Sequence, residues 1–208
     1  MESPADVAPA PVPPLADASC RWLAYVARRA LRDALAAGDP SARDLPLRPC
    51  DRPDDPRLDE PARLFVSWHD GEALVGCIGA LEPHDALEGG VARYAVAAGM
   101  HDPRLPPADP RRWTALECEV SILGAPVLLA ARGLAAIGEE LTPGRDGVIL
   151  RVGGRRAFFL PSVWRQLPRP EAFLTVLCRK AGADPRRDGV DARAEVLCAF
   201  AYAEPVAG

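Results

Sequence analysis

Cys77 is the residue in this sequence whose type and neighbours come closest to chemistry. It lies between Gly76 and Gly79 in a Leu-Val-Gly-Cys-Ile-Gly segment at residues 74–79. Glycine inside a strand often marks a place where a ligand or another backbone comes close, so the thiol is expected to have room around it. Two interpretations stay open: a nucleophilic or ligand-contacting thiol, and a small buried side chain, because free cysteine is among the most buried residue types.

A second candidate is the proline-rich loop of residues 102–107, Asp-Pro-Arg-Leu-Pro-Pro. Proline fixes φ, so the loop should hold Asp102 and Arg104 in place at a low cost in entropy. The guanidinium group of Arg104 could bind a carboxylate or a phosphate through two hydrogen bonds. Alternatively, Arg104 pairs with Asp102 at the surface.

The remaining residues with reactive side chains form no recognisable centre. Glu117 and Glu119 share one face of a predicted strand and could act as an acid–base pair, although same-face glutamates usually mark the solvated side of a sheet. The three histidines have no partner at a motif spacing, and the six cysteines are far apart, without a CxxC pair. Zinc needs closely spaced ligands, so we expect no metal site, and we expect no cofactor.

Composition excludes several classes of protein. The chain has 208 residues, of which 49% are hydrophobic, and a net charge of −4, which is typical of a globular protein rather than a disordered one. A pI near 5.5 and scattered arginines argue against a nucleic-acid-binding surface. The sequence shows no apolar run of about 18 residues and no signal-peptide pattern, so we expect a cytoplasmic protein with reduced cysteines and no membrane span.

The elements that must position Cys77 begin with a hairpin. Asp70-Gly71 suits the positive φ angles of a two-residue type I′ loop between two apolar runs. That loop would set Leu64 opposite Cys77. Because side chains alternate along a strand, Val75, Cys77 and Gly79 should share one face.

The rest of the sequence alternates helical and strand patterns. Residues from Ser19 to Ala37 repeat apolar side chains at helical spacing, with Ser19 as the predicted cap. A second helix is predicted from Asp85 to Met100, where Asp85 and Glu88 would form a capping box. Further along, the patterns predict a strand at 115–125, a short helix at 133–141, a hairpin of 148–152 and 155–160, a helix at 170–181 and a final strand at 195–203. Interleaved hairpins and helices predict an α+β fold, mainly of antiparallel sheets with flanking helices.

Eight short segments, in order, resemble the AMMECR-type domain family, which is also called AmmeMemoRadiSam system protein A. They extend over most of the chain, and it is their common order that carries the resemblance. The segments are Leu64-Phe65-Val66, LVGCIG at 74–79, Pro83, DPRLPP at 102–107, LECEVSIL at 116–123, DGVIL at 146–150, FFLPSVW at 158–164 and LCRKAG at 177–182.

The resemblance implies a single AMMECR-type domain at residues 16–208, with two α+β lobes of unequal size and the smaller lobe around residues 62–100. Residues 1–15, rich in proline and alanine, are predicted to be a disordered tail. The family implies a bacterial or archaeal protein that acts with a Memo-like protein of the extradiol-dioxygenase fold and with a radical SAM enzyme. This chain lacks the CxxxCxxC motif of an iron–sulfur cluster, so the radical chemistry would belong to that partner.

One position departs from the family pattern and separates two hypotheses. The family usually has Leu-Arg-Gly-Cys-Ile-Gly, and here Val75 replaces the arginine. An arginine beside Cys77 would favour the thiolate, so its loss weakens a nucleophilic role. The first hypothesis is therefore a docking or substrate-like component that binds its partners through the face around Cys77. The other residues of this face are Val75, Gly76, Gly79, Asp102 and Arg104.

The alternative hypothesis is a cysteine-dependent enzyme. Cys77 would be the nucleophile, in a cleft between the two lobes. Arg104 would bind the anionic group of a small substrate.

Overall fold

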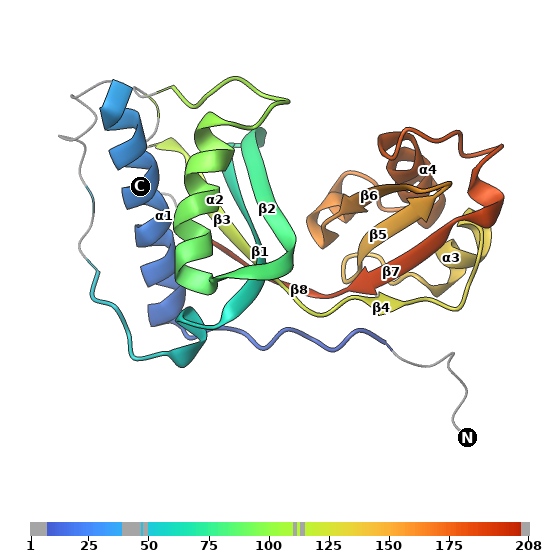
Figure 1. The fold of residues 1–208 in the computed structure, drawn as a ribbon, viewed down its shortest axis with the longest axis horizontal. Coiled ribbons are helices and arrows are strands. Elements are labelled where there is room, and N and C mark those ends of the chain that lie inside the picture. Colours follow the sequence, from blue (N-terminus) through green and yellow to red (C-terminus); the bar gives the residue numbers. More distant parts are fainter. Residues whose placement is uncertain (1–7, 39–46, 48–49, 110–111, 113–114, 205–208) are drawn as a thin grey trace. The chain divides into compact units, whose positions relative to one another are not determined.

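The computed structural model describes residues 8–38, 47, 50–109, 112 and 115–204 (Figure 1). The chain divides into two compact units. The hairpin unit is formed by Pro13–Leu123 and Phe200–Gly208, and the second unit by Met1–Val12 and Gly124–Ala199. The hairpin unit holds the larger share of the chain, whereas the resemblance implied that the hairpin belongs to the smaller lobe.

Two helices cover one face of the sheet in the hairpin unit (Figure 1). α1 spans Asp17–Gly38 and α2 spans Leu87–Met100, close to the predicted bounds. Each repeats buried apolar side chains at helical spacing. The two helices pack closely, because a methyl group at Gly99 of α2 would lie 2.6 Å from Leu31 Cδ1 of α1.

Neither predicted helix cap is present. α1 begins before Ser19, whose hydroxyl group donates a hydrogen bond to Asp55 Oδ2 at 2.7 Å instead. α2 has Ala86 at its N-cap position and no side-chain cap, and the Asp85 carboxylate accepts a hydrogen bond from Arg93 at 3.0 Å. These side chains therefore serve tertiary contacts rather than helix ends.

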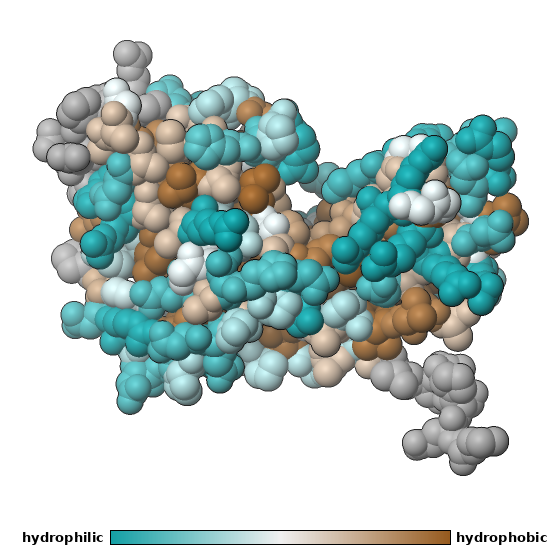
Figure 2. All heavy atoms as spheres, viewed as in Figure 1, coloured by the Kyte–Doolittle hydropathy of each residue, from teal (hydrophilic) through white to brown (hydrophobic). Residues whose placement is uncertain are grey.

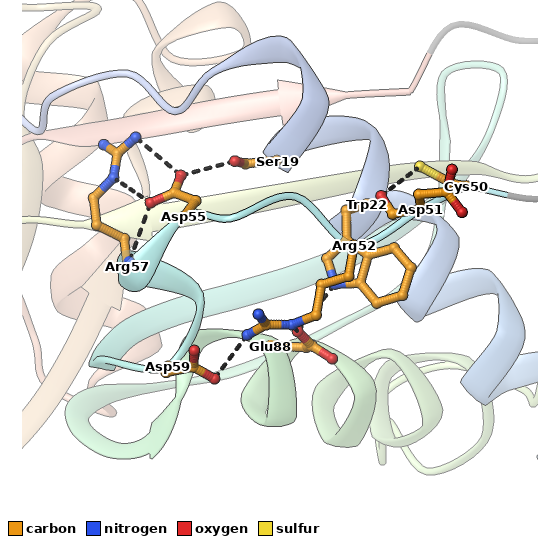
Figure 3. A network of polar contacts seen from close by, with 9 residues as sticks. All are labelled: Ser19, Trp22, Cys50, Asp51, Arg52, Asp55, Arg57, Asp59 and Glu88. Atoms are coloured by element: carbon orange, nitrogen blue, oxygen red, sulfur yellow. Dashed lines mark hydrogen bonds and ion pairs between the residues drawn. The ribbon is translucent and has the colours of Figure 1, made fainter.

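The connection from α1 to the first strand is held by two carboxylates (Figure 3). Besides Ser19, Asp55 binds Arg57, at the start of the short 3₁₀ helix η2 (Pro56–Leu58). Glu88 of α2 accepts hydrogen bonds from Trp22 Nε1 at 3.0 Å and from Arg52 Nε at 2.7 Å. Residues 50–59 are thereby tied to both helices.

The sheet of the hairpin unit has the strand order β2-β1-β3-β8. The strands are β1 (Pro61–Asp70), β2 (Ala73–Ala86), β3 (Glu117–Leu123) and β8 (Ala199–Ala203). Leu64, Val66 and Trp68 of β1 are fully buried on the face that α1 and α2 cover. The Trp68 indole N–H donates to the Ala95 carbonyl oxygen of α2 at 2.9 Å, which fixes the helix on the sheet.

The register of the β1–β2 hairpin differs from the prediction. The loop is Gly71-Glu72 rather than Asp70-Gly71, because only the glycine of the loop takes a positive φ (60°). Asp70 therefore pairs with Ala73. A bulge near the loop shifts the register again, so that Ser67, and not Leu64, lies opposite Cys77.

The second unit has a sheet of strand order β4-β7-β5-β6 and two helices. The strands are β4 (Val127–Leu128), β5 (Gly147–Val152), β6 (Arg155–Phe159) and β7 (Arg193–Leu197); the helices are α3 (Leu134–Glu140) and α4 (Pro170–Lys180), with the 3₁₀ helices η4 (Pro161–Arg165) and η5 (Gly189–Asp191). Its core includes Trp164 of η4 stacked on Phe173 of α4, with ring centroids 3.9 Å apart. The predicted elements from residue 133 to 181 are thus all present.

The predicted final strand and N-terminal tail both need correction. The final strand breaks at Cys198 into β7 and β8, which belong to different sheets. Residues 1–7 of the predicted disordered tail lie outside the described residues, but Pro9 and Leu15 in the remainder are buried. Leu15 is buried in the core of the hairpin unit, and the Cys198 thiol donates to the Pro9 carbonyl oxygen at 3.5 Å.

The expected fold class is confirmed, since helices flank two antiparallel sheets. Within the described residues, no helix combines the length and apolar character that a membrane crossing requires.

Candidate functional site

Cys77 lies on β2, the edge strand of its sheet, and its side chain points away from the helices. The neighbouring residue, Gly76, faces α2, since a Cβ atom there would lie 1.8 Å from the Ala98 carbonyl oxygen. Side chains alternate along a strand, so Cys77 and its partner Ser67 occupy the opposite face. The thiol is partly buried, and all six cysteines are free.

The loop after α2 folds back onto the backbone of Cys77. Asp102 Oδ2 accepts a hydrogen bond from the Cys77 backbone N–H at 3.0 Å, and Arg104 Nη2 donates to the Cys77 carbonyl oxygen at 2.9 Å. Arg104 also donates hydrogen bonds to the Asp102 carboxylate from Nε (2.9 Å) and from Nη2 (2.6 Å). We call this arrangement of Asp102 and Arg104 on the Cys77 backbone the edge clamp.

The edge clamp explains why an exposed strand can end the sheet here. An edge strand presents unpaired N–H and C=O groups, and those of Cys77 are satisfied by a carboxylate and a guanidinium group. The backbone N–H and C=O groups of Cys77 point away from β1. Cys77 and Ser67 therefore form a non-hydrogen-bonded antiparallel pair, in which the two side chains lie close together. The clamp therefore positions Cys77 beside Ser67.

The clamp also sets the charge state of its own residues. The Asp102 side chain is buried, and the Arg104 guanidinium group holds the pKa of its carboxyl well below the usual range, with help from two backbone N–H groups. The same hydrogen bonds raise the pKa of Arg104. The pair is therefore ionised at neutral pH.

Burial raises the pKa of the Cys77 thiol. A hydrogen bond from Ser67 and the charge of Arg104 act in the opposite direction, and the charges of Asp102 and Glu119 add to the rise. The ionised groups that act on this thiol thus include two acids and one base that is already paired. At neutral pH the side chain is a thiol and not a thiolate.

The two glycines beside Cys77 do not make room for a ligand, contrary to the prediction. Gly76 lets α2 approach β2, as its distance to Ala98 shows. A Cβ atom at Gly79 would lie 2.1 Å from the Leu64 carbonyl oxygen and 2.5 Å from Phe65 Cα. Both glycines are needed because protein backbone occupies the space of a side chain.

The strict alternation of side chains that would place Val75 and Cys77 on one face is interrupted at Val75. Leu74 pairs with His69 and Gly76 pairs with Trp68, so Val75 is the extra residue of a bulge and has no partner on β1. Its side chain is partly buried and packs against the core of the hairpin unit. Val75, where the resemblance led us to expect an arginine, therefore occupies a bulge position and not a position in the same row as the thiol.

Ser67 and Glu119 join Cys77 in a row of paired residues across β2, β1 and β3, which we call the polar row. Ser67 lies opposite Cys77 on one side and opposite Glu119 on the other. The Ser121 hydroxyl group donates to Glu119 Oε1 at 3.4 Å. Ser67 and Ser121 are buried although both are polar. Ser67 could be found from sequence only with the correct hairpin register, because its neighbours on β1, Val66 and Trp68, are both apolar.

The arrangement around Cys77 is better suited to holding the strand edge in place than to activating the thiol as a nucleophile. Thiol, hydroxyl and carboxylate lie side by side across β2, β1 and β3, but no histidine of the described residues is among the groups that shift the pKa of the thiol. In the part of the chain that the structure describes, no three His, Cys, Asp or Glu residues come together to hold a metal ion.

Comparison with known proteins decides the family. A model of the AMMECR1 family matches residues 24–199. The chain belongs to the AMMECR1 family. It is 34% identical over 165 residues to a protein of Thermoplasma acidophilum, with 76% of each chain covered. It is 33% identical over 173 residues to a protein of Methanothermobacter thermautotrophicus, covering 83% of this chain and 86% of that one.

Other relatives agree over different lengths. A Thermofilum pendens protein is 38% identical over 114 residues, and this chain spans about half the length of that relative (52%). The crystal structure of an uncharacterised protein from Pyrococcus horikoshii has a TM-score of 0.77 at 27% identity, covering 92% of this chain and 94% of that one. The relatives named here are archaeal.

Four of the eight family segments lie at the site. LFV, LVGCIG, DPRLPP and LECEVSIL belong to β1, β2, the clamp loop and β3. They are the three strands of the polar row and the loop that clamps it. In this AMMECR1-family chain, Cys77, Asp102 and Arg104 are thus brought together, as predicted, while Val75, Gly76 and Gly79 have packing roles.

Proposed function

We propose that this AMMECR1-family chain is a docking or substrate-like component that presents the clamped edge of β2 to other proteins. Its partners would be those that the family resemblance implies, a Memo-like protein of the extradiol-dioxygenase fold and a radical SAM enzyme. The edge clamp is the observation that carries the proposal. Asp102 and Arg104 hydrogen-bond the backbone of Cys77 and so hold it in place, rather than activating its thiol.

The exposed side chains near the clamp fit a docking role. Arg104 is 53% exposed beyond its contacts with Asp102, and Leu74, earlier on β2, is 41% exposed. An exposed apolar side chain on the edge strand and an exposed arginine bound to the same strand are the kinds of residue found where one protein recognises another. The clamp keeps this surface in one conformation, which lowers the entropic cost of binding.

Co-purification from the source organism tests the proposal. Tagged wild-type chain should retain the Memo-like protein and the radical SAM enzyme, identified by mass spectrometry. Leu74→Glu should weaken retention about tenfold or more, since it places a charge in the contact. Arg29→Glu, on an exposed part of α1, is the matched control and should retain both partners. Failure of the wild type to retain either partner would remove the proposal's support.

A cysteine-dependent enzyme is the second candidate, and the polar row of Cys77, Ser67 and Glu119 is the observation that favours it. Arg104 Nε and Nη2 are already engaged, so binding of a small anion would fall to Nη1. The reactivity of the thiol separates the two candidates. An enzyme of this kind needs a Cys77 thiolate at neutral pH, whereas a docking component needs none.

A further inference from the structure

Three arginines stand directly opposite one another on the second unit's sheet. Arg151 of β5 pairs with Arg156 of β6 on one side and with Arg193 of β7 on the other. Directly paired residues of antiparallel strands point to the same face. We call these three residues the arginine row.

The arginine row lies on the outward face of the sheet. The residues that alternate with it, Leu150, Val152, Ala157 and Ala194, belong to the core. All three arginines are exposed, and Figure 2 shows hydrophilic residues gathered over β5 and β6. Neighbouring strands are about 4.8 Å apart, so the three guanidinium groups start from positions spread over roughly 10 Å.

The row is under-neutralised by its own chain. Arg151 Nε binds Glu195 Oε1 at 3.0 Å, on the same face of β7. Among the described residues, neither Arg156 nor Arg193 has a carboxylate partner. Like charges directly opposite each other in a sheet are destabilising. A folded protein gains nothing from this placement unless something outside the chain supplies negative charge.

We propose that the arginine row binds carboxylate side chains of an acidic segment in a protein partner. The Arg151–Glu195 pair shows the contact within the chain, because a carboxylate already accepts a hydrogen bond from Nε of the middle arginine. Arg156 and Arg193 offer the same planar fork on either side of it. The row therefore fits two further carboxylates spaced about 10 Å apart at most, which an extended or helical acidic segment supplies.

A nucleic-acid partner fits less well. Three arginines, one of them paired, neutralise few phosphates, whereas phosphate contacts supply most of the affinity of nucleic-acid binding. The chain's net charge of −4 also opposes the approach of a long polyanion. A short acidic protein segment avoids both costs, and the inference does not depend on the role proposed for Cys77.

Binding of a fluorescein-labelled hexaglutamate peptide, followed by fluorescence anisotropy at low salt, tests the inference with the full-length chain. Arg156→Gln/Arg193→Gln should bind about tenfold more weakly than the wild type. Arg132→Gln/Arg186→Gln removes two exposed arginines of the same unit outside the row and should bind as the wild type does. Thermal unfolding shows whether the row variant is folded: its midpoint should be equal to or above that of the wild type, because the repulsion is gone.

Three results would overturn the inference. The wild type fails to bind the peptide, the row variant binds it as well as the wild type, or a single-stranded oligothymidylate binds more tightly than the peptide through the same two arginines. The last result would assign the row to nucleic acid. Peptide binding that is lost only in the row variant would support it.

Discussion

At the scale of the residue, Asp102 is the side chain on which the site depends. Its carboxylate accepts hydrogen bonds from the backbone N–H groups of Cys77 and Arg104 and from the guanidinium group of Arg104. The sequence predicted that proline-rich surroundings would hold this aspartate in place, and the structure adds what it holds. Its partner in sequence, Arg104, was open to an anion-binding role, and most of its fork is used within the chain instead.

Replacing Asp102 should make the free energy of unfolding less dependent on pH in the acid range. The pKa of its carboxyl is lowered by folding, so its contribution is complete above the unfolded value near 3.9 and is lost as the pH falls below it. Asp102→Asn should cost about 2 kcal/mol near neutral pH, and the difference from wild type should shrink towards about pH 3. Urea unfolding at several pH values measures both, with exposed Asp54→Asn as the control; a constant difference across pH would contradict the clamp.

At the scale of the element, the position of the β2 edge depends on how close α2 comes to it. Periodicity predicted both α2 and the strand, because side-chain spacing is a local property. The hairpin register was not predictable in the same way, because it depends on the position of the loop and on the bulge at Val75. The loop at Gly71-Glu72 and this bulge together set Ser67 opposite Cys77, and the polar row was missed for that reason.

A methyl group between α2 and β2 should therefore be costly. Gly76→Ala places Cβ 1.8 Å from the Ala98 carbonyl oxygen, which is backbone and must move, so we expect a loss of about 1–3 kcal/mol in unfolding free energy. Gly89 lies in α2, and a Cβ atom there would meet nothing within 4 Å. Gly89→Ala should therefore be neutral or should stabilise the protein by up to about 1 kcal/mol. Chemical denaturation of both variants decides. Equal stability of the two would show that Gly76 serves ligand access rather than packing.

At the scale of the whole molecule, the chain combines two units with different surfaces. The hairpin unit carries the clamped thiol, and the second unit carries the arginine row. Interleaved hairpin and helix patterns predicted the fold class, and the docking hypothesis placed Cys77, Asp102 and Arg104 on one face. Neither revealed the arginine row, because like-charged residues become neighbours only through strand pairing between residues as distant as 151 and 193.

The break at Cys198 shows the same limit. A continuous alternating pattern predicted one strand, and the chain instead leaves one sheet and enters the other at that residue. Alternation reports which side chains are buried, but it carries no information on which sheet buries them. Non-local pairing of this kind cannot be inferred from a local pattern.

The reactivity of Cys77 tests the central claim most directly. In a Cys50→Ser background, which removes the other partly exposed thiol, alkylation of Cys77 by iodoacetamide is followed by mass spectrometry across pH. We predict that Cys77 reacts more slowly than glutathione at neutral pH and titrates above the ordinary thiol value of about 8.5, reaching the rate of a free thiol in urea. Faster reaction than glutathione, with a midpoint below neutral pH, would contradict the docking account and establish Cys77 as a nucleophile.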